Sequence, residues 1–170
     1  MSIGYSSTVD TPTGPFTTVV TADDVVIASG WTAKLADLMP QVSATVRPSE
    51  IRPRPDLGRI TAAVRGYHDG DLAAVDEVEV AQRSGEFMEH AWRVLRTVPA
   101  GKPVSYADYA MLTGRAAAVR AAASACARNA AALFVPCHRV IRTDGSLGGF
   151  RWGLAVKRWL LAHEEAAISC

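Results

Sequence analysis

Short runs of β-branched and aromatic residues alternate with turn residues over the first thirty positions, a pattern typical of consecutive strands. The runs at residues 5–9, 16–20 and 25–28 predict three strands. Turn sequences at residues 11–14 and 22–24 separate these runs. We therefore expect an antiparallel meander in the N-terminal part of the chain.

The next forty residues have a weaker pattern. A short helix is predicted over residues 31–39, and the four prolines within residues 40–55 predict a surface linker. Apolar positions at helical spacing predict a further helix over residues 56–67, which the sequence His68-Asp69-Gly70 would end.

The second half of the chain has the spacing of helices. Apolar stripes predict three of them, at residues 84–98, 105–112 and 115–128. Ser84 and Ser105 stand at the expected N-caps of the first two helices. A turn with Gly114 separates the last two, which gives the helix-turn-helix pattern.

Together these elements predict an α+β fold. A small domain of antiparallel sheet and helix would occupy residues 1–82. A mostly α-helical domain with a winged-helix-like helix-turn-helix would occupy residues 83–170, and its last helix is expected over residues 154–165.

Residues 1–82 carry six Lys or Arg against eleven Asp or Glu, whereas residues 83–170 carry twelve against six. The basic half indicates an anionic partner, most commonly nucleic acid; alternatively, it docks on the acidic half.

The predicted helix at residues 115–128 is covered largely by alanine. Arg120, Ser124 and Arg128 lie four residues apart on its outer face, and Val119 and Cys126 on its inner face. Small side chains let another surface approach the helix backbone closely, which suits a helix that enters a DNA groove with one long arginine projecting. The alternative is an alanine-rich helix of a compact bundle, with Cys126 as a small core residue.

Composition argues against several classes of protein. No apolar run approaches the roughly 18–20 residues of a membrane span, and the N-terminus lacks the basic and apolar regions of a secretory signal. The cysteines, Cys126, Cys137 and Cys170, are an odd number without CxxC spacing, so neither a disulfide framework nor a zinc knuckle is indicated. We expect a cytoplasmic protein, because an unpaired thiol stays reduced there, and an exposed thiol at Cys170.

Cys137 and His138 stand side by side after an apolar run and Pro136. The run predicts a short buried strand over residues 133–136, which ends where the thiol leaves the core. A thiol attacks as the thiolate, and a neighbouring histidine or cation lowers its pKa from roughly 8.5. The alternative for an isolated Cys-His pair is a structural cysteine beside a histidine with satisfied hydrogen bonds.

Further motifs surround this pair at fixed spacing. They are Val-Pro-Ala-Gly-Lys-Pro-Val-Ser-Tyr at residues 98–106, Arg120, Asn129, Pro-Cys-His-Arg-Val at residues 136–140, and Trp-Leu-Leu-Ala-His-Glu at residues 159–164. In this set the chain resembles the O6-alkylguanine-DNA alkyltransferases, the methylated-DNA–protein-cysteine methyltransferase family. The resemblance is close over residues 84–165 and loose before them. It implies a DNA-repair protein that flips a damaged guanine out of the duplex and moves its O6-alkyl group to Cys137.

The resemblance also implies roles for single side chains around the thiol. His138 would act through a water molecule as base toward Cys137, and Glu164 would orient and charge that imidazole. Tyr106 would donate its phenolic proton to the departing guanine. Asn129 would hold the turn that positions the cysteine segment.

Contacts with DNA and with the flipped base follow from the same resemblance. Arg120 would enter the base stack from the minor groove and replace the flipped nucleotide. Backbone carbonyls of Val140 and Cys137 would face the guanine amine, and the Arg151 N–H would face O6. The further implied positions are Ala117, Ala121, Ser124 and Arg128 for DNA, and Val135, Pro136, Phe150 and Trp152 for the substrate pocket.

Two positions depart from the family pattern: Phe150 stands where the family often has tyrosine, and Ala130-Ala131-Ala132 replaces a loop that often contains proline. Residues 147–153 form a glycine-rich segment, the glycine loop. Because this loop carries the bulky Trp152, we expect a tight pocket that prefers methyl to benzyl groups. The cysteines that bind zinc in some family members are missing, so we expect no metal and no cofactor. The expected partner is double-stranded DNA carrying O6-alkylguanine or O4-alkylthymine, bound by a monomer without membrane association.

Two other functions stay open. A cysteine hydrolase or acyltransferase would also use Cys137 and His138, but it would turn over repeatedly and would not need Arg120. A non-catalytic lesion-recognition protein would need the DNA-binding helix but no reactive thiol. The thioether formed by alkyl transfer has no carbonyl for water to attack, so the family reaction predicts a protein that inactivates itself after one turnover.

Overall fold

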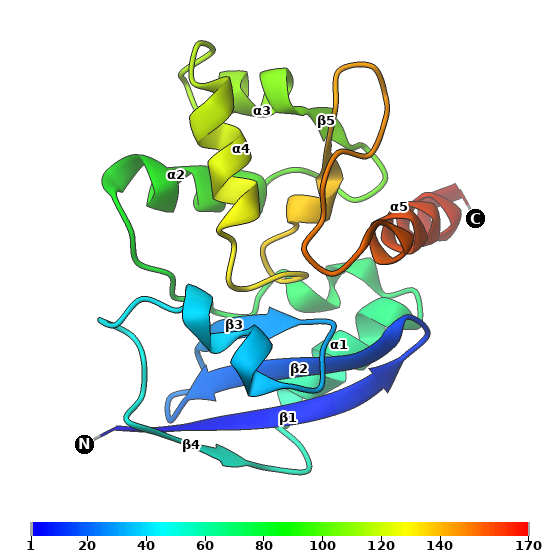
Figure 1. Cartoon of the computed structure of the whole chain (residues 1–170). Helices are drawn as coiled ribbons and strands as arrows, with labels where there is room; N and C mark the ends of the chain where they lie inside the picture. The colour runs from blue at the N-terminus through cyan, green and yellow to red at the C-terminus, as the bar shows by residue number, and fades with distance from the viewer. Residues whose placement is uncertain (1, 170) are drawn as a thin grey trace. The chain divides into compact units, whose positions relative to one another are not determined.

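The computed structural model describes residues 2–169, without the side chain of Ser169, so the expected exposure of Cys170 lies outside the described residues. The chain forms two compact units, shown in Figure 1. The first, the N-terminal unit, comprises Met1–Arg83 and Ala130–Phe134. The second, the C-terminal unit, comprises Ser84–Asn129 and Val135–Cys170.

A four-stranded sheet forms the N-terminal unit. Its strands are β1 (Ile3–Thr11), β2 (Gly14–Thr21), β3 (Val26–Gly30) and β4 (Glu50–Pro53), in the order β3-β2-β1-β4. The predicted antiparallel meander is confirmed for β1, β2 and β3. The linker prediction was wrong for β4, which pairs with β1 in parallel. Its proline, Pro53, lies at the end of an edge strand, where a missing N–H is tolerated.

The core of the N-terminal unit lies between this sheet and helix α1 (Arg59–His68), and the fully buried Phe16 and Tyr67 belong to it. The helix predicted over residues 31–39 was wrong. Single 3₁₀ turns form instead at Leu35–Asp37 and Met39–Gln41, because Pro40 removes a backbone donor. The unit also contains the 3₁₀ turn Leu72–Val75. The Ser29 N–H donates a hydrogen bond to the Ala130 carbonyl (2.9 Å) and so links β3 to the second segment of the unit, Ala130–Phe134.

Four helices make up most of the C-terminal unit: α2 (Glu86–Leu95), α3 (Tyr106–Leu112), α4 (Val119–Ala127) and α5 (Leu154–Ser169). A short parallel pair, β5 (Val104–Ser105) and β6 (Val140–Ile141), joins them. Ser105 caps α3 as predicted, since its Oγ accepts a hydrogen bond from the Asp108 N–H. The Ser84 cap was wrong: Gly85 occupies the N-cap of α2, and the Ser84 N–H donates to the Glu89 carboxylate.

Helix α4 is fixed against its neighbours by apolar packing and hydrogen bonds. The Trp92 indole N–H of α2 donates to the Ala125 carbonyl at 2.8 Å. Ala122 and Ala125 are fully buried, whereas Val119, predicted on the inner face, is 36% exposed. The helix begins at Val119 instead of residue 115, after a turn that uses Gly114 at a φ of +90°. Within residues 2–169, no helix has the length and apolar character needed to cross a bilayer.

Candidate active site

A tight turn at Pro136 presents the Cys137 thiol. Pro136 has φ −82° and ψ 67°, and the Cys137 N–H donates to the Val135 carbonyl at 2.9 Å, which together define an inverse γ-turn. One turn of 3₁₀ helix follows over Cys137–Arg139. The strand predicted over residues 133–136 was wrong, because the chain turns at Leu133 with a φ of +79°; the residues are buried, as that prediction required.

Asn129 holds this turn from the end of α4. Its amide Nδ2 donates to the Val135 carbonyl at 2.7 Å, and Asn129 is itself buried. The same side chain hydrogen-bonds the Cys137 sulfur. The arrangement ties the cysteine turn to the end of the helix that carries the outer arginines.

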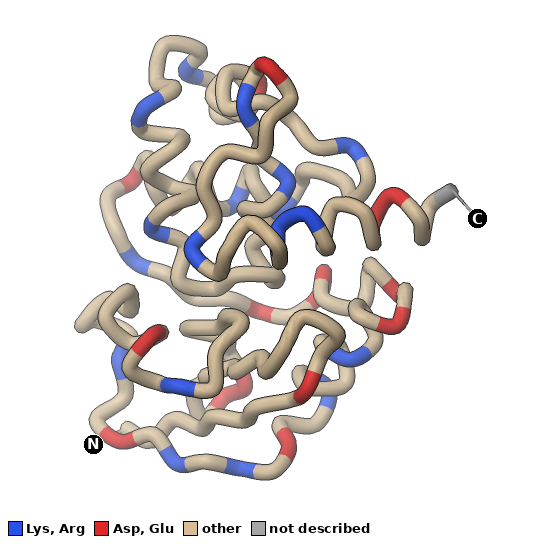
Figure 2. The backbone as a smooth tube through the Cα atoms, turned by 45° about the vertical axis from the view of Figure 1, so that its right-hand side comes forward, with Lys and Arg blue, Asp and Glu red and all other residues tan. Residues whose placement is uncertain are grey.

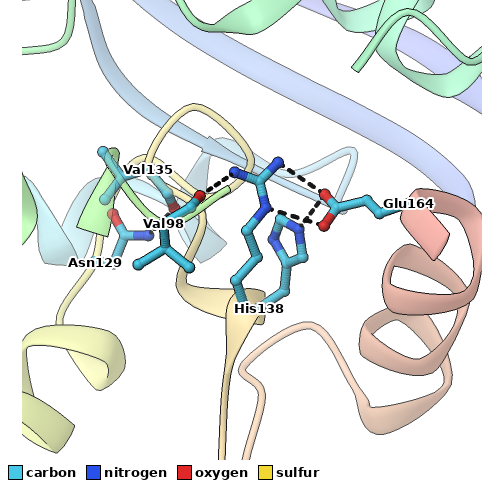
Figure 3. Close-up of polar contacts among 6 residues, drawn as sticks. Val98, Asn129, Val135, His138 and Glu164 are labelled. Atoms are coloured by element: carbon cyan, nitrogen blue, oxygen red, sulfur yellow. Dashed lines mark hydrogen bonds and ion pairs between the residues drawn. The ribbon is translucent and has the colours of Figure 1, made fainter. Parts of the chain in front are cut away.

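A buried ionic cluster lies beside the turn, formed by His138, Arg139 and Glu164 (Figure 3). The His138 Nε2 lies 2.7 Å from Glu164 Oε2. The Arg139 guanidinium grips the same carboxylate with two bonds of 2.9 Å, from Nε to Oε1 and from Nη2 to Oε2. Its Nη1 donates to the Val98 carbonyl at 2.9 Å. The cluster joins the active-site turn, the segment after α2 and the last helix.

The hydrogen bonds of the cluster fix the tautomer of His138. Burial alone would raise the pKa of Glu164, but the charges and hydrogen bonds of His138 and Arg139 lower it, so the carboxylate is ionised. An ionised carboxylate only accepts hydrogen bonds, so the proton of neutral His138 resides on Nε2. The buried Nδ1 has no hydrogen-bond partner among the described residues. Nδ1 is therefore the atom that can take up a proton.

Electrostatics at the thiol differ from the sequence prediction. Burial raises the pKa of Cys137 above its ordinary value, while the hydrogen bond from Asn129 and the charge of Lys157 oppose this rise. Burial also lowers the pKa of His138, against the effect of Glu164. The adjacent histidine was expected to lower the pKa of Cys137, but burial of the thiol outweighs any such effect, and both groups are desolvated and neutral.

Lys157 fixes the glycine loop to the active-site segment. Its side chain is almost fully buried on α5, and Nζ donates to the carbonyls of Val140 (2.8 Å) and Gly149 (3.2 Å). The Val140 carbonyl, which the resemblance assigns to the guanine amine, therefore already accepts one hydrogen bond.

A cavity of about 240 Å³ opens beside the thiol, entirely within the C-terminal unit. Small side chains of α4 form one part of its wall, and the glycine loop with two aromatic rings forms another. The lining residues are Tyr106, Ala123, Cys126, Ala127, Asn129, Cys137, Gly149, Phe150, Arg151 and Trp152. Cys126, predicted as a possible core residue, is half-buried and faces this cavity.

Tyr106 closes the cavity on the side of α3. The glycine loop passes close to its ring: a Cβ at Gly148, which has a φ of +72°, would lie 3.1 Å from the Tyr106 hydroxyl oxygen. Burial raises the pKa of Tyr106, so the phenol keeps its proton at neutral pH. A glycine is therefore needed at position 148 for both backbone conformation and space.

The structure brings together most residues that the sequence singled out, and their roles stay predictions. Phe150, Arg151 and Trp152 line the cavity, whereas Val135, Pro136 and Val140 are buried and are not among its lining residues. The positions predicted to face DNA are mostly exposed: Arg120, Ser124 and Arg128 on α4 and Ala117 in the turn before it, with Ala121 half-buried. Figure 2 shows the basic positions on the backbone.

Sequence reasoning gave no role to Arg139 and did not consider Lys157. A signal was present for Lys157: residues 157, 160 and 164 share one face of α5, and two of these three positions carry charged residues, which are rarely buried without a partner. Nothing local to the sequence indicates that Arg139 and His138 contact the same carboxylate. Within residues 2–169, no group of three or more His, Cys, Asp or Glu side chains is arranged to hold a metal ion.

The cluster predicts that stability falls with acidification. The pKa of His138 is lowered from 6.5 in the folded chain, so below about 6.5 the unfolded chain binds more protons and the free energy of unfolding decreases. Glu164, whose pKa is lowered from 4.5, adds a further loss at lower pH. Thermal melting between pH 7.5 and 5 measures this slope. His138→Gln should reduce the dependence of the melting temperature on pH. His163→Gln, on the same helix α5 as Glu164, is the control and should leave that dependence in place. Equal slopes in the wild type and in His138→Gln would contradict the assignment of the slope to His138.

Known proteins resemble this chain in sequence and in structure. A sequence model of the family described as "6-O-methylguanine DNA methyltransferase, DNA binding domain" matches residues 86–166. The chain is 50% identical over 82 residues to the bifunctional transcriptional activator/DNA repair enzyme Ada of Escherichia coli, which covers 48% of this chain and 23% of Ada. It is 37% identical over 107 residues to the methylated-DNA–protein-cysteine methyltransferase of Salmonella typhimurium, 63% of each protein. The matched part thus spans less than two thirds of these two relatives.

A further relative matches nearly the whole chain. The methylated-DNA–protein-cysteine methyltransferase of Mycobacterium bovis is 35% identical over 162 residues, which cover 94% of this chain and 91% of the relative. The crystal structure of Mycobacterium tuberculosis OGT in complex with DNA superposes with a TM-score of 0.78 at 30% identity, over 96% of this chain and 94% of that one. The chain belongs to the methylated-DNA–protein-cysteine methyltransferase family.

Proposed function

We propose that this protein repairs DNA by moving the alkyl group of O6-alkylguanine to the sulfur of Cys137, once per molecule. The observation that carries the proposal is a buried thiol that lines a cavity, with the free Nδ1 of a Glu164-bound histidine on the next residue. A relative with the methyltransferase name matches 94% of the chain. The substrate is a base flipped out of the duplex, because a stacked base cannot reach a thiol in a cavity.

The chemistry follows from the protonation states of the resting site. The thiol proton of Cys137 passes through a water molecule to Nδ1 of His138, and Glu164 stabilises the imidazolium that forms. The sulfur attacks the alkyl carbon, a C–S bond forms, and the bond from that carbon to O6 breaks. The leaving guanine gains a proton from the Tyr106 hydroxyl. The positive charge of Lys157 and the Asn129 amide stabilise the thiolate as it develops.

A thiol that is neutral at rest has a functional advantage in this scheme. Because burial raises the pKa of Cys137, the resting side chain is a thiol and not a thiolate. A thiol reacts slowly with electrophiles in solution that are not bound in the cavity. Proton transfer then coincides with the arrival of a base in the cavity. The product is a thioether, which water cannot hydrolyse, so the protein acts stoichiometrically.

The first experiment counts repaired bases. A duplex with one O6-methylguanine inside a restriction site is incubated with increasing protein, and restored cleavage is measured. We expect one site restored per protein molecule. Repeated turnover would favour the hydrolase-type alternative, and tight binding without restoration would favour the lesion-recognition alternative.

We infer that double-stranded DNA meets the exposed face of α4 through its minor groove, with Arg120 replacing the flipped base. Arg120, Ser124 and Arg128 are exposed on this face, and Ala121 between them leaves the backbone approachable. The basic second half of the chain supports an anionic partner. We also propose that the protein acts as a monomer in the cytoplasm, without membrane contact.

Replacing Arg120 with alanine should slow repair of duplex DNA roughly 10- to 100-fold, since base flipping costs a few kcal/mol and each 1.4 kcal/mol is a factor of ten. The reaction with free O6-methylguanine base should be unchanged, because no flipping is needed. Single-turnover rates on both substrates measure the effect. Arg158→Ala, an equal charge change at an exposed position of α5, is the control. An equal loss of rate on duplex DNA and on the free base would contradict the proposal that Arg120 replaces the flipped base.

The pocket should discriminate by size of the alkyl group. Its volume of about 240 Å³ lies below the roughly 300–1,000 Å³ of typical ligand pockets, and Trp152 and Phe150 occupy its wall. We expect the rate of methyl transfer to exceed the rate of benzyl transfer at least tenfold. Trp152→Ala should reduce this ratio, because the smaller side chain enlarges the cavity. Single-turnover rates on O6-methyl- and O6-benzylguanine duplexes measure it. Comparable rates on both substrates in the wild type would overturn this expectation.

A further inference from the structure

Each of the three nitrogens of the Arg139 guanidinium makes a hydrogen bond inside the protein. Two of its nitrogens contact the two oxygens of Glu164, and the third contacts the Val98 carbonyl. Figure 3 shows these bonds together with the one between His138 and Glu164. A paired fork of this kind fixes both the position and the rotation of a carboxylate, which a single hydrogen bond from His138 cannot do.

We propose that Arg139 is a positioning residue for alkyl transfer: it orients Glu164 against His138 and balances the carboxylate charge, so that His138 stays neutral with Nδ1 ready for the thiol proton. The inference rests on the proposed function, because it concerns the proton transfer of that reaction. Arg139 touches neither the cavity nor the thiol in this scheme and acts only through Glu164 and His138.

Charge balance carries the argument. Glu164 is fully buried and both partners are nearly so, and a buried net charge is strongly disfavoured. With Arg139 present, one carboxylate and one guanidinium cancel, and His138 needs no proton. Among the described residues, Lys157 on α5 also acts on His138, and its charge disfavours the imidazolium; the thiol of the preceding residue, Cys137, is neutral. The lowered pKa of His138 agrees with this balance.

Removal of the guanidinium should reverse the balance. The buried carboxylate would then lack its counter-charge, and His138 would restore neutrality by binding a proton at Nδ1. A protonated Nδ1 cannot accept the proton of Cys137. Because only neutral His138 is active, a raised His138 pKa moves the acidic limb of the pH–rate profile to higher pH. A purely structural role for Arg139 would lower the rate at every pH and leave that limb in place.

The test compares Arg139→Gln, which removes the charge, with Arg139→Lys, which keeps it and loses the fork. Arg158→Gln, at an exposed position of α5, is the matched control. The single-turnover methyl-transfer rate is measured from pH 5.5 to 9, and the charge state of His138 is read from the ¹⁵N shifts of its ring by NMR. We expect Arg139→Gln to be at least tenfold slower at pH 7, to recover at higher pH, and to hold a charged His138.

Arg139→Lys should keep His138 neutral at pH 7, with a slower rate and an unmoved acidic limb. A neutral His138 in folded Arg139→Gln, or a charged one in Arg139→Lys, would overturn the proposal. If Arg139→Gln does not fold, the NMR spectrum of Arg139→Lys alone shows whether the positive charge at position 139 is enough to keep His138 neutral or whether the paired fork is also needed. The ¹⁵N result does not depend on activity, so wild-type protein that fails to take up methyl would overturn the proposed function and leave the charge-balance result standing.

Discussion

Cys137→Ser should bind O6-methylguanine duplex as tightly as the wild type and accept no methyl group. The substitution keeps the shape of the side chain at the turn set by Pro136 and Asn129. A serine hydroxyl beside the neutral His138 is a far weaker nucleophile than a thiol, because the sulfur is both more polarisable and more easily ionised. Transfer of a labelled methyl group and fluorescence anisotropy of a labelled duplex measure the two properties separately.

Cys126→Ser is the matched control for that experiment. Cys126 lines the same cavity, but it lies on α4 and lacks the adjacent histidine. Burial raises its pKa, so it stays protonated. We expect the variant to retain methyl transfer. Transfer that persists in Cys137→Ser and disappears in Cys126→Ser would move the acceptor to the helix.

Glu164→Ala should lower the free energy of unfolding by about 3–5 kcal/mol, the cost of leaving a buried partner charge without its counter-ion. Arg139 and His138 both lose their hydrogen-bond acceptor in this variant. Methyl transfer should also slow, because the imidazolium of His138 loses its stabilising carboxylate. Urea denaturation at pH 7.5 measures the stability, and single-turnover repair at a temperature where the variant is folded measures the rate.

Glu165→Ala controls for the loss of a negative charge from the same turn of α5. Glu165 is exposed, and surface substitutions are usually within about 0.5 kcal/mol. A joint change of Arg139 and Glu164 to Met and Leu should recover part of the stability, since apolar side chains of similar volume replace the whole ion pair, but it should not recover methyl transfer. A loss in Glu164→Ala as small as that in Glu165→Ala would mean that the cluster contributes little to folding.

The sequence predicted the parts of the site that depend on local patterns. Adjacent Cys137 and His138 after a proline gave the candidate nucleophile, which stays a prediction, and Ser105 correctly predicted the start of α3, because both features depend on neighbouring residues. The antiparallel β1–β3 meander followed from alternation and turn residues. The helix predicted over residues 31–39 was wrong, since the segment forms only single 3₁₀ turns next to Pro40.

The remaining features depend on contacts between distant residues. Arg139 reaches Glu164 across 25 positions of sequence, and no pattern near Arg139 indicates that carboxylate. The burial of Cys137 decides the direction of its pKa shift, which the adjacent histidine led the sequence analysis to predict in the opposite sense. Strand β4 pairs with β1 across more than forty residues, a contact that its local sequence does not indicate, and the four prolines within residues 40–55 suggested a loop.

The most direct test of the central claim is the intact mass of the protein after incubation with duplex DNA that carries one O6-methylguanine, followed by peptide mapping. The account predicts a gain of one methyl group per molecule, located on Cys137, with one guanine restored in the DNA. A protein of unchanged mass that nevertheless binds the duplex, or a methyl group found on another residue, would contradict it.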